Sequence, residues 1–171
     1  RILVANLGEP PTEFSWNGKT YTPASFKAEF VPQDMCEDYV VFMNDPTLPY
    51  YRRYTVDNSR NCYEFENWTF LNLPASELLD MGVESLKNGK MFCFSADTDA
   101  FPSLMMGGIY HTGIYNLEDM LGISLDMEKE DLVSSCEIKS AHAVAMAGVE
   151  LDESGKPVKW LVENSFGEER G

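Results

Sequence analysis

Two stretches near the C-terminal end of the sequence alternate between inward and outward positions as β-strands do. In Ser140–Glu150 the residues on one side are His142, Val144, Met146 and Gly148, and alanines fill the other side. In Val158–Asn164 the residues on one side are Val158, Trp160, Val162 and Asn164. The polar turn formers Asp152–Gly155 lie between the two stretches. The pattern predicts an antiparallel hairpin that carries His142 and Asn164.

The register of this hairpin decides whether the two polar residues meet. Folding the strands about Glu153 places His142 directly opposite Asn164, with Cβ atoms about 4.5–5.5 Å apart. An amide oxygen on one imidazole nitrogen fixes the ring and its tautomer and leaves the other nitrogen to pair with a thiol. We therefore interpret the pair as two members of a Cys-His-Asn triad. A strand histidine satisfied by any neighbour is the alternative that the pattern leaves open.

The rest of the chain mixes helical and strand patterns. Leu78, Leu79, Val83 and Leu86 repeat with the helical period after Pro74. We expect helices at 1–7, from Thr22-Pro23 onward, 74–87, 116–121 and 127–134, a turn at Asn17-Gly18, and strands at 40–43, 68–73 and 90–96. The elements do not follow a βαβ rhythm, so the predicted class is α+β. The glycine-bearing stretch 97–115 is typical of loops that line sites.

Charge and length limit the kind of partner. The 171 residues carry a net charge of −15, which argues against binding nucleic acid or an anionic membrane surface. The sequence has no apolar run of the ~20 residues that a membrane span needs. The chain starts inside an expected helix and ends in mid-motif, so we expect it to be an excerpt whose targeting information lies elsewhere.

The cysteines and acidic residues give no metal signature. Cys36, Cys62, Cys93 and Cys136 form no CxxC pair, so a structural zinc site is not expected. We interpret them as free thiols in a reducing compartment, with Cys93 as a small core residue, and predict a cytoplasmic protein, although secretion stays open. Asp97, Asp99 and His111 could in principle bind a metal, but a solvated loop turn is the preferred interpretation. No metal or other cofactor is expected.

Several segments of the chain match one known family. They include Ala141-His142-Ala143, the turn DESGKPVKW and the block Val162-Glu163-Asn164-Ser165. Upstream, YTPASFKAEF, MNDPTLPYYRRYTVDN and LNLPASELLDMGVESLKNGKMFCFSADTD follow in the same order as in that family. Together these segments resemble the papain-like cysteine peptidases, and within them the bleomycin hydrolase and aminopeptidase C branch. The resemblance covers nearly the whole chain.

The resemblance implies a two-lobed papain-like fold. Residues 1–171 would be part of one peptidase domain, namely the barrel-like second lobe with helical insertions. The nucleophilic cysteine, in a Gly-x-Cys-Trp context, would lie on the other lobe, outside this chain. His142 would act as general base and then acid, and Asn164 would orient it, with no metal needed. The implied protein is a cysteine-type peptidase of the aminopeptidase or bleomycin hydrolase kind, a homohexamer that acts on peptides.

Some positions depart from the family pattern. None of the four cysteines of the chain precedes a tryptophan. Phe166 stands where the family usually has the tryptophan that shields the Asn–His hydrogen bond, and Ala141 stands where a threonine is common. These changes are compatible with an active, divergent peptidase. They are equally compatible with the alternative of a catalytically inactive papain-fold protein that acts in binding or assembly.

Overall fold

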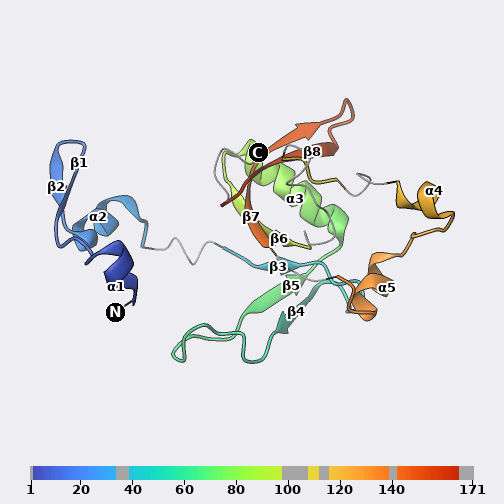
Figure 1. Ribbon diagram of the computed structural model, residues 1–171, viewed down its shortest axis with the longest axis horizontal. Helices are drawn as coiled ribbons and strands as arrows, with labels where there is room; N and C mark the ends of the chain where they lie inside the picture. The colour runs from blue at the N-terminus through green and yellow to red at the C-terminus, as the bar shows by residue number, and fades with distance from the viewer. Residues whose placement is uncertain (1, 34–38, 98–107, 112–115, 139–141, 166–171) are drawn as a thin grey trace. The chain divides into compact units, whose positions relative to one another are not determined.

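The chain falls into two compact units. A computed structural model describes residues 2–33, 39–97, 108–111, 116–138 and 142–165 (Figure 1). The units are Arg1–Val40 and Val41–Gly171. Unit 1 contains α1 (Ile2–Leu7), β1 (Phe14–Trp16), β2 (Lys19–Tyr21) and α2 (Pro23–Phe30). Unit 2 contains β3 (Phe42–Met43), β4 (Arg52–Thr55), β5 (Thr69–Asn72), α3 (Ala75–Lys87), β6 (Phe92–Ala96), α4 (Leu117–Leu121), α5 (Lys129–Ser134), β7 (His142–Leu151) and β8 (Pro157–Glu163).

This mixture of helices and small sheets confirms the predicted α+β class. The described strands form three separate sheets, in the orders β1-β2, β3-β5-β4 and β6-β7-β8, and none of the three closes into a barrel. None of the described helices is long and apolar enough to cross a membrane. That residues 1–171 belong to one peptidase domain stays a prediction.

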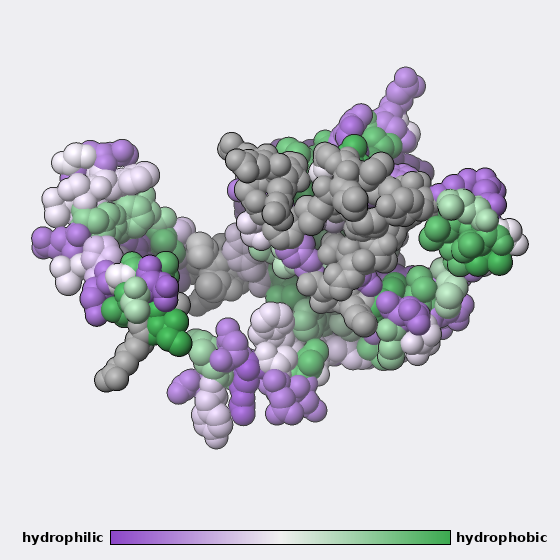
Figure 2. Space-filling model, in the orientation of Figure 1, coloured by the Kyte–Doolittle hydropathy of each residue, from purple (hydrophilic) through white to green (hydrophobic). Residues whose placement is uncertain are grey.

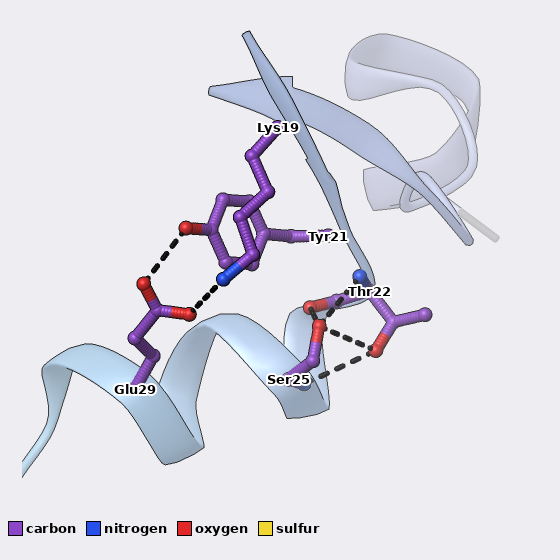
Figure 3. A network of polar contacts seen from close by, with 5 residues as sticks. All are labelled: Lys19, Tyr21, Thr22, Ser25 and Glu29. Atoms are coloured by element: carbon purple, nitrogen blue, oxygen red, sulfur yellow. Dashed lines mark hydrogen bonds and ion pairs between the residues drawn. The ribbon is translucent and has the colours of Figure 1, made fainter. Parts of the chain in front are cut away.

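Unit 1 is built from a tight hairpin and a capped helix. Asn17 and Gly18 have φ of 48° and 76°, the left-handed values that a two-residue hairpin turn requires. Thr22 begins α2 with a capping box, shown in Figure 3. The Ser25 amide donates to Thr22 Oγ1 at 3.1 Å, and the Thr22 amide donates to Ser25 Oγ at 3.0 Å. Both the turn and the helix start confirm what the sequence predicts.

Aromatic rings attach α2 to the hairpin. The ring of Phe26 lies 5.3 Å from Phe14, 5.3 Å from Tyr21 and 4.5 Å from Phe30. Beside them, Lys19 Nζ lies 2.5 Å from a carboxylate oxygen of Glu29, and the Tyr21 hydroxyl donates to the other oxygen at 2.9 Å (Figure 3). The ion pair is exposed and contributes little, so the rings carry the attachment.

Asn72 organises the first sheet of unit 2. It lies at the end of β5, between β3 and β4, and its side chain has no exposed surface. Its Oδ1 accepts from the Asp45 amide at 2.9 Å. Its Nδ2 donates to the carbonyls of Asp45, Leu48 and Pro49 at 2.8, 3.0 and 3.4 Å. One buried amide thus holds the loop that connects β3 to β4.

Helix α3 lies across the β6-β7-β8 sheet (Figure 1). Its closest approach is at Gly82, where a Cβ would lie 3.0 Å from the ring of Phe92 and 3.3 Å from that of Trp160. Val83 of the helix and Met146 of β7 are buried in the same layer. The helix ends at Asn88, and Gly89 follows at φ 70°. Its predicted extent and end are confirmed, and this packing supports the face of the sheet that carries the candidate site.

The hairpin register differs from the prediction. Met146 pairs with Val162 and Leu151 with Pro157, so the turn is centred on Ser154, one residue later than predicted. Asp152 closes it, because its amide donates to the Lys156 carbonyl at 2.9 Å and Gly155 takes φ 84°. His142 and Asn164 are therefore not directly opposed.

Two further sequence expectations are wrong in this sheet. Ala147 is an extra residue between the paired Met146 and Gly148, so Gly148 lies with Leu161 on the face opposite to Met146. Cys93 is exposed rather than buried, because it pairs with Ala145 on the face that α3 does not cover. Strand alternation was identified correctly, but which face becomes buried depends on the position of the helix.

Many large apolar side chains of the described residues remain exposed. The buried apolar side chains are Tyr21, Leu73, Val83 and Met146. Exposed ones include Leu117, Met120, Leu121, Ile123, Leu125 and Met127 on and after α4. Figure 2 shows this apolar surface over α4. The described core is therefore small for the length of chain.

Candidate active site

The ends of two neighbouring strands bring His142 and Asn164 to one place. His142 is the first residue of β7 and pairs with Ala96 of β6. Asn164 directly follows β8, and the pairing of Ala145 with Glu163, continued by one step, sets Asn164 opposite Val144. His142 and Asn164 are thus diagonal neighbours on one face, a separation that long side chains can bridge.

The two side chains are hydrogen-bonded, and both are half-buried. His142 Nε2 lies 2.9 Å from Asn164 Oδ1. The backbone N–H of Ser165 donates to the same Oδ1 at 2.7 Å. Because an N–H can only donate, the atom that it meets must be the amide oxygen, which fixes the orientation of the Asn164 amide.

This orientation also fixes the histidine tautomer. Asn164 Oδ1 can only accept, so His142 Nε2 must carry the proton. In the neutral ring the lone pair then belongs to Nδ1, which is the basic nitrogen of the ring. A backbone N–H therefore decides which nitrogen of His142 carries the lone pair.

Tyr110 is a third member of the site that the sequence did not identify. Asn164 Nδ2 donates to the Tyr110 hydroxyl at 3.4 Å. Tyr110 is half-buried and lies 54 residues earlier in the chain. The one available signal was the glycine-bearing stretch 97–115, which indicated a site-lining loop but no particular residue in it.

The other candidates from the sequence are Phe166, Asp97, Asp99 and His111. Phe166 and Asp99 lie outside the described residues, so the predicted shielding by Phe166 stays a prediction. Across the part of the chain that the structure describes, no group of three His, Cys, Asp or Glu residues could hold a metal ion. Asp97 and His111 are among the described residues, so neither belongs to such a group.

The structure places Cys93 away from the side chain of His142. Cys93 pairs with Ala145, which alternates with His142 and so lies on the opposite face of the sheet. Cys62 and Cys136 are exposed free thiols, and Cys36 lies outside the described residues. Among the described residues, hydrogen bonds join the side chains of His142, Asn164 and Tyr110 at this site.

Comparison with known proteins gives relatives along the whole chain. Aminopeptidase C of Streptococcus thermophilus is 30% identical over 181 residues, covering 99% of this chain and 40% of its own length. Bleomycin hydrolase of Rattus norvegicus is 32% identical over 187 residues, covering 100% of this chain and 41% of its own. The chain thus spans about two fifths of the length of these relatives.

A solved structure and a family model agree with these relatives. The crystal structure of PepW from Lactobacillus rhamnosis matches with a TM-score of 0.84 and 32% identity, over 99% of this chain and 40% of that one. The model of the Peptidase C1-like family matches residues 1–171. These matches confirm the resemblance that the sequence motifs indicate: the chain belongs to the Peptidase C1-like family.

Proposed function

We propose that this chain supplies the general base and its orienting residue to a cysteine peptidase. The observation that carries the proposal is the hydrogen bond from His142 Nε2 to Asn164 Oδ1, at 2.9 Å, with Oδ1 also anchored by the Ser165 amide. An imidazole held in one tautomer by an amide oxygen is the arrangement that activates a thiol in a Cys-His-Asn triad.

The reaction follows from this geometry. His142 Nδ1 takes the proton of a cysteine thiol, and the thiolate attacks the carbonyl carbon of a peptide bond. The C–N bond then breaks as Nδ1–H returns the proton to the leaving amine, and a thioester remains. Water attacks the thioester while Nδ1 accepts its proton, which releases the carboxylic acid and restores the thiol. Throughout the reaction Asn164 Oδ1 accepts a hydrogen bond from His142 Nε2–H and keeps the imidazole ring in one orientation.

The nucleophilic cysteine, in this proposal, comes from a segment outside residues 1–171. Two observations support this. Cys93 lies on the face of the sheet opposite to His142, and large apolar side chains of the described residues, such as Leu121 and Leu161, are exposed. So much exposed surface is what a lobe that packs against further protein would show. Residues 1–171 would then be the second lobe of a papain-like domain with its insertions.

The proposed substrate is a peptide with an unblocked amino terminus. Relatives named aminopeptidase C and bleomycin hydrolase support this class. The net charge of −15 supports it as well, since a negative protein field attracts a cationic amino terminus. Comparing aminoacyl fluorogenic substrates with their N-acetylated forms tests the assignment. Equal or faster cleavage of the acetylated forms would contradict it.

The peptidase proposal is tested on the full-length protein with the thiol reagents E-64 and iodoacetamide. We expect stoichiometric labelling of one cysteine outside residues 1–171, with loss of peptidase activity. His142→Gln should slow both labelling and turnover, while Cys93→Ser, the matched thiol control, should change neither. If the folded protein reacted with neither reagent and cleaved no peptide, it would instead be a catalytically inactive papain-fold protein that acts in binding or assembly.

The proposal extends to assembly and location. We expect a homohexamer, as the family resemblance implies, and light scattering of the purified full-length protein measures this directly. Free thiols at Cys62, Cys93 and Cys136 fit a reducing compartment, and so a cytoplasmic location. Recovery of the protein in a secreted fraction would contradict the location.

A further inference from the structure

We propose that Tyr110 is a positioning residue that holds the Asn164 amide, and through it the His142 ring, in the reactive orientation. The inference rests on the proposed function for its catalytic consequence. Its structural content is independent of that function, because it concerns three contacts around one amide group.

Each polar atom of the Asn164 side chain has its own partner. On the oxygen side, Oδ1 accepts from His142 Nε2 and from the Ser165 amide, at 2.9 and 2.7 Å. On the nitrogen side, Nδ2 donates to the Tyr110 hydroxyl at 3.4 Å. The two oxygen contacts fix the position of one end of the amide. The contact to Tyr110 adds a point of attachment at the nitrogen end, so rotation about the Cβ–Cγ bond would break contacts at both ends of the amide.

The chain arrangement leaves the orientation of the Asn164 amide to its side-chain contacts. Asn164 lies one residue past the end of β8, so the regular ladder does not hold its backbone. Its bond to His142 is diagonal rather than between directly opposed residues, so strand pairing does not set the orientation of the amide. Tyr110 comes from a separate stretch of chain, 54 residues away, and supplies a third contact at the nitrogen end of the amide.

The expected effect is small but specific. The 3.4 Å contact is a weak neutral hydrogen bond, so its loss should change the local equilibrium by about two- to fivefold. Tyr110→Phe removes only the hydroxyl and keeps the ring packing. Because the hydroxyl touches neither peptide nor thiol in this scheme, the change should lower kcat and leave KM unaltered.

The first test needs no enzymatic activity. In the full-length protein, amide hydrogen exchange of Ser165 reports the Oδ1 contact, since that amide donates to Asn164. We expect Tyr110→Phe to speed Ser165 exchange about two- to fivefold, with the ladder amides of Leu161 and Val162 unchanged. Tyr54→Phe is the matched control, because the Tyr54 hydroxyl donates to the Pro49 carbonyl at 2.9 Å, away from this site. Unchanged Ser165 exchange in Tyr110→Phe would overturn the proposal.

The second test separates positioning from a general structural role. Tyr110→Phe should reduce kcat in the wild-type background and have no further effect when combined with Asn164→Ala. An equal loss in both backgrounds would mean that Tyr110 acts independently of Asn164 and would overturn the inference. If the wild-type protein cleaves no peptide, the proposed function fails, while Ser165 exchange still decides the role of Tyr110.

Discussion

Replacing Asn72 by alanine should destabilise unit 2 more than any exposed substitution. The side chain is completely buried and makes four hydrogen bonds to backbone groups of the loop between β3 and β4. Two of those groups keep another partner, because the Leu48 amide donates to the Asp45 carbonyl and the Tyr54 hydroxyl donates to the Pro49 carbonyl. The Asp45 amide and the Leu48 carbonyl lose the partner that Asn72 provides.

The magnitude follows from these contacts. Three of the bonds have good lengths, between 2.8 and 3.0 Å, and a protein hydrogen bond has a net value of about 1 kcal/mol. We therefore expect Asn72→Ala to lower the free energy of unfolding by about 3 kcal/mol. Urea unfolding of the full-length protein measures the total, and hydrogen exchange of the Asp45 amide measures the local effect.

An isosteric variant separates hydrogen bonding from packing. Asn72→Asp keeps the volume and the Oδ1 acceptor but turns a carboxylate oxygen toward the carbonyls that Nδ2 now contacts. It should be at least as destabilising as Asn72→Ala. Asn88→Ala is the exposed control, since Asn88 Nδ2 donates to a helix-end carbonyl at 2.7 Å, and it should cost less than about 1 kcal/mol. If Asn72→Asp left the free energy of unfolding unchanged, the reasoning would be refuted. The role of Asn72 would then be to fill space in the core.

Three further predictions concern the hairpin and its supporting helix. Asn164→Ala should lower kcat about 10- to 100-fold, because a hydrogen bond to a charged imidazolium contributes about 1.5–3 kcal/mol, and steady-state kinetics would show whether KM is spared. Gly82→Val should destabilise the protein by about 2 kcal/mol, since even a Cβ there lies 3.0 Å from an aromatic ring; thermal unfolding at or above the wild-type midpoint would contradict this. Hydrogen bonds from the Ser154 hydroxyl and from the Lys156 amide hold the pKa of the Asp152 carboxyl below its usual value. The ionised carboxylate therefore stabilises the turn fully above the pKa that Asp152 has in the unfolded chain. This stabilisation is lost as the pH falls through the lower pKa of Asp152 in the folded protein. A carboxyl-carbon NMR titration should show Ser154→Ala raising that pKa.

The sequence predicted the local backbone structure correctly where a few adjacent residues determine it. The Asn17-Gly18 turn and the start of α2 at Thr22 depend on backbone preferences within four residues, and both are confirmed. The extent of α3 was also readable, because its apolar residues repeat at the helical period. Such features need no knowledge of the rest of the fold.

Features that depend on exact turn geometry or on an irregular loop could not be predicted from the sequence. The alternation of β7 and β8 predicted that His142 and Asn164 share a face, but the turn is centred on Ser154 rather than on Glu153, and this changed the register. A hairpin register depends on turn geometry to within one residue, which composition of the turn does not specify. Tyr110 was missed for a related reason, since no periodic pattern marks a contact made by an irregular loop.

The two irregularities of the β7–β8 hairpin also predict where evolution can change its length. Ala147 is unpaired in β7 and Val158 is unpaired in β8, while the residues that flank each of them are paired. Deleting either one would leave all the neighbouring pairs intact and straighten the ladder. A deletion at Val144 would instead move His142 to the other face of the sheet and away from Asn164. Single-residue gaps in homologous sequences should therefore be tolerated at these two positions and selected against between the histidine and the bulge.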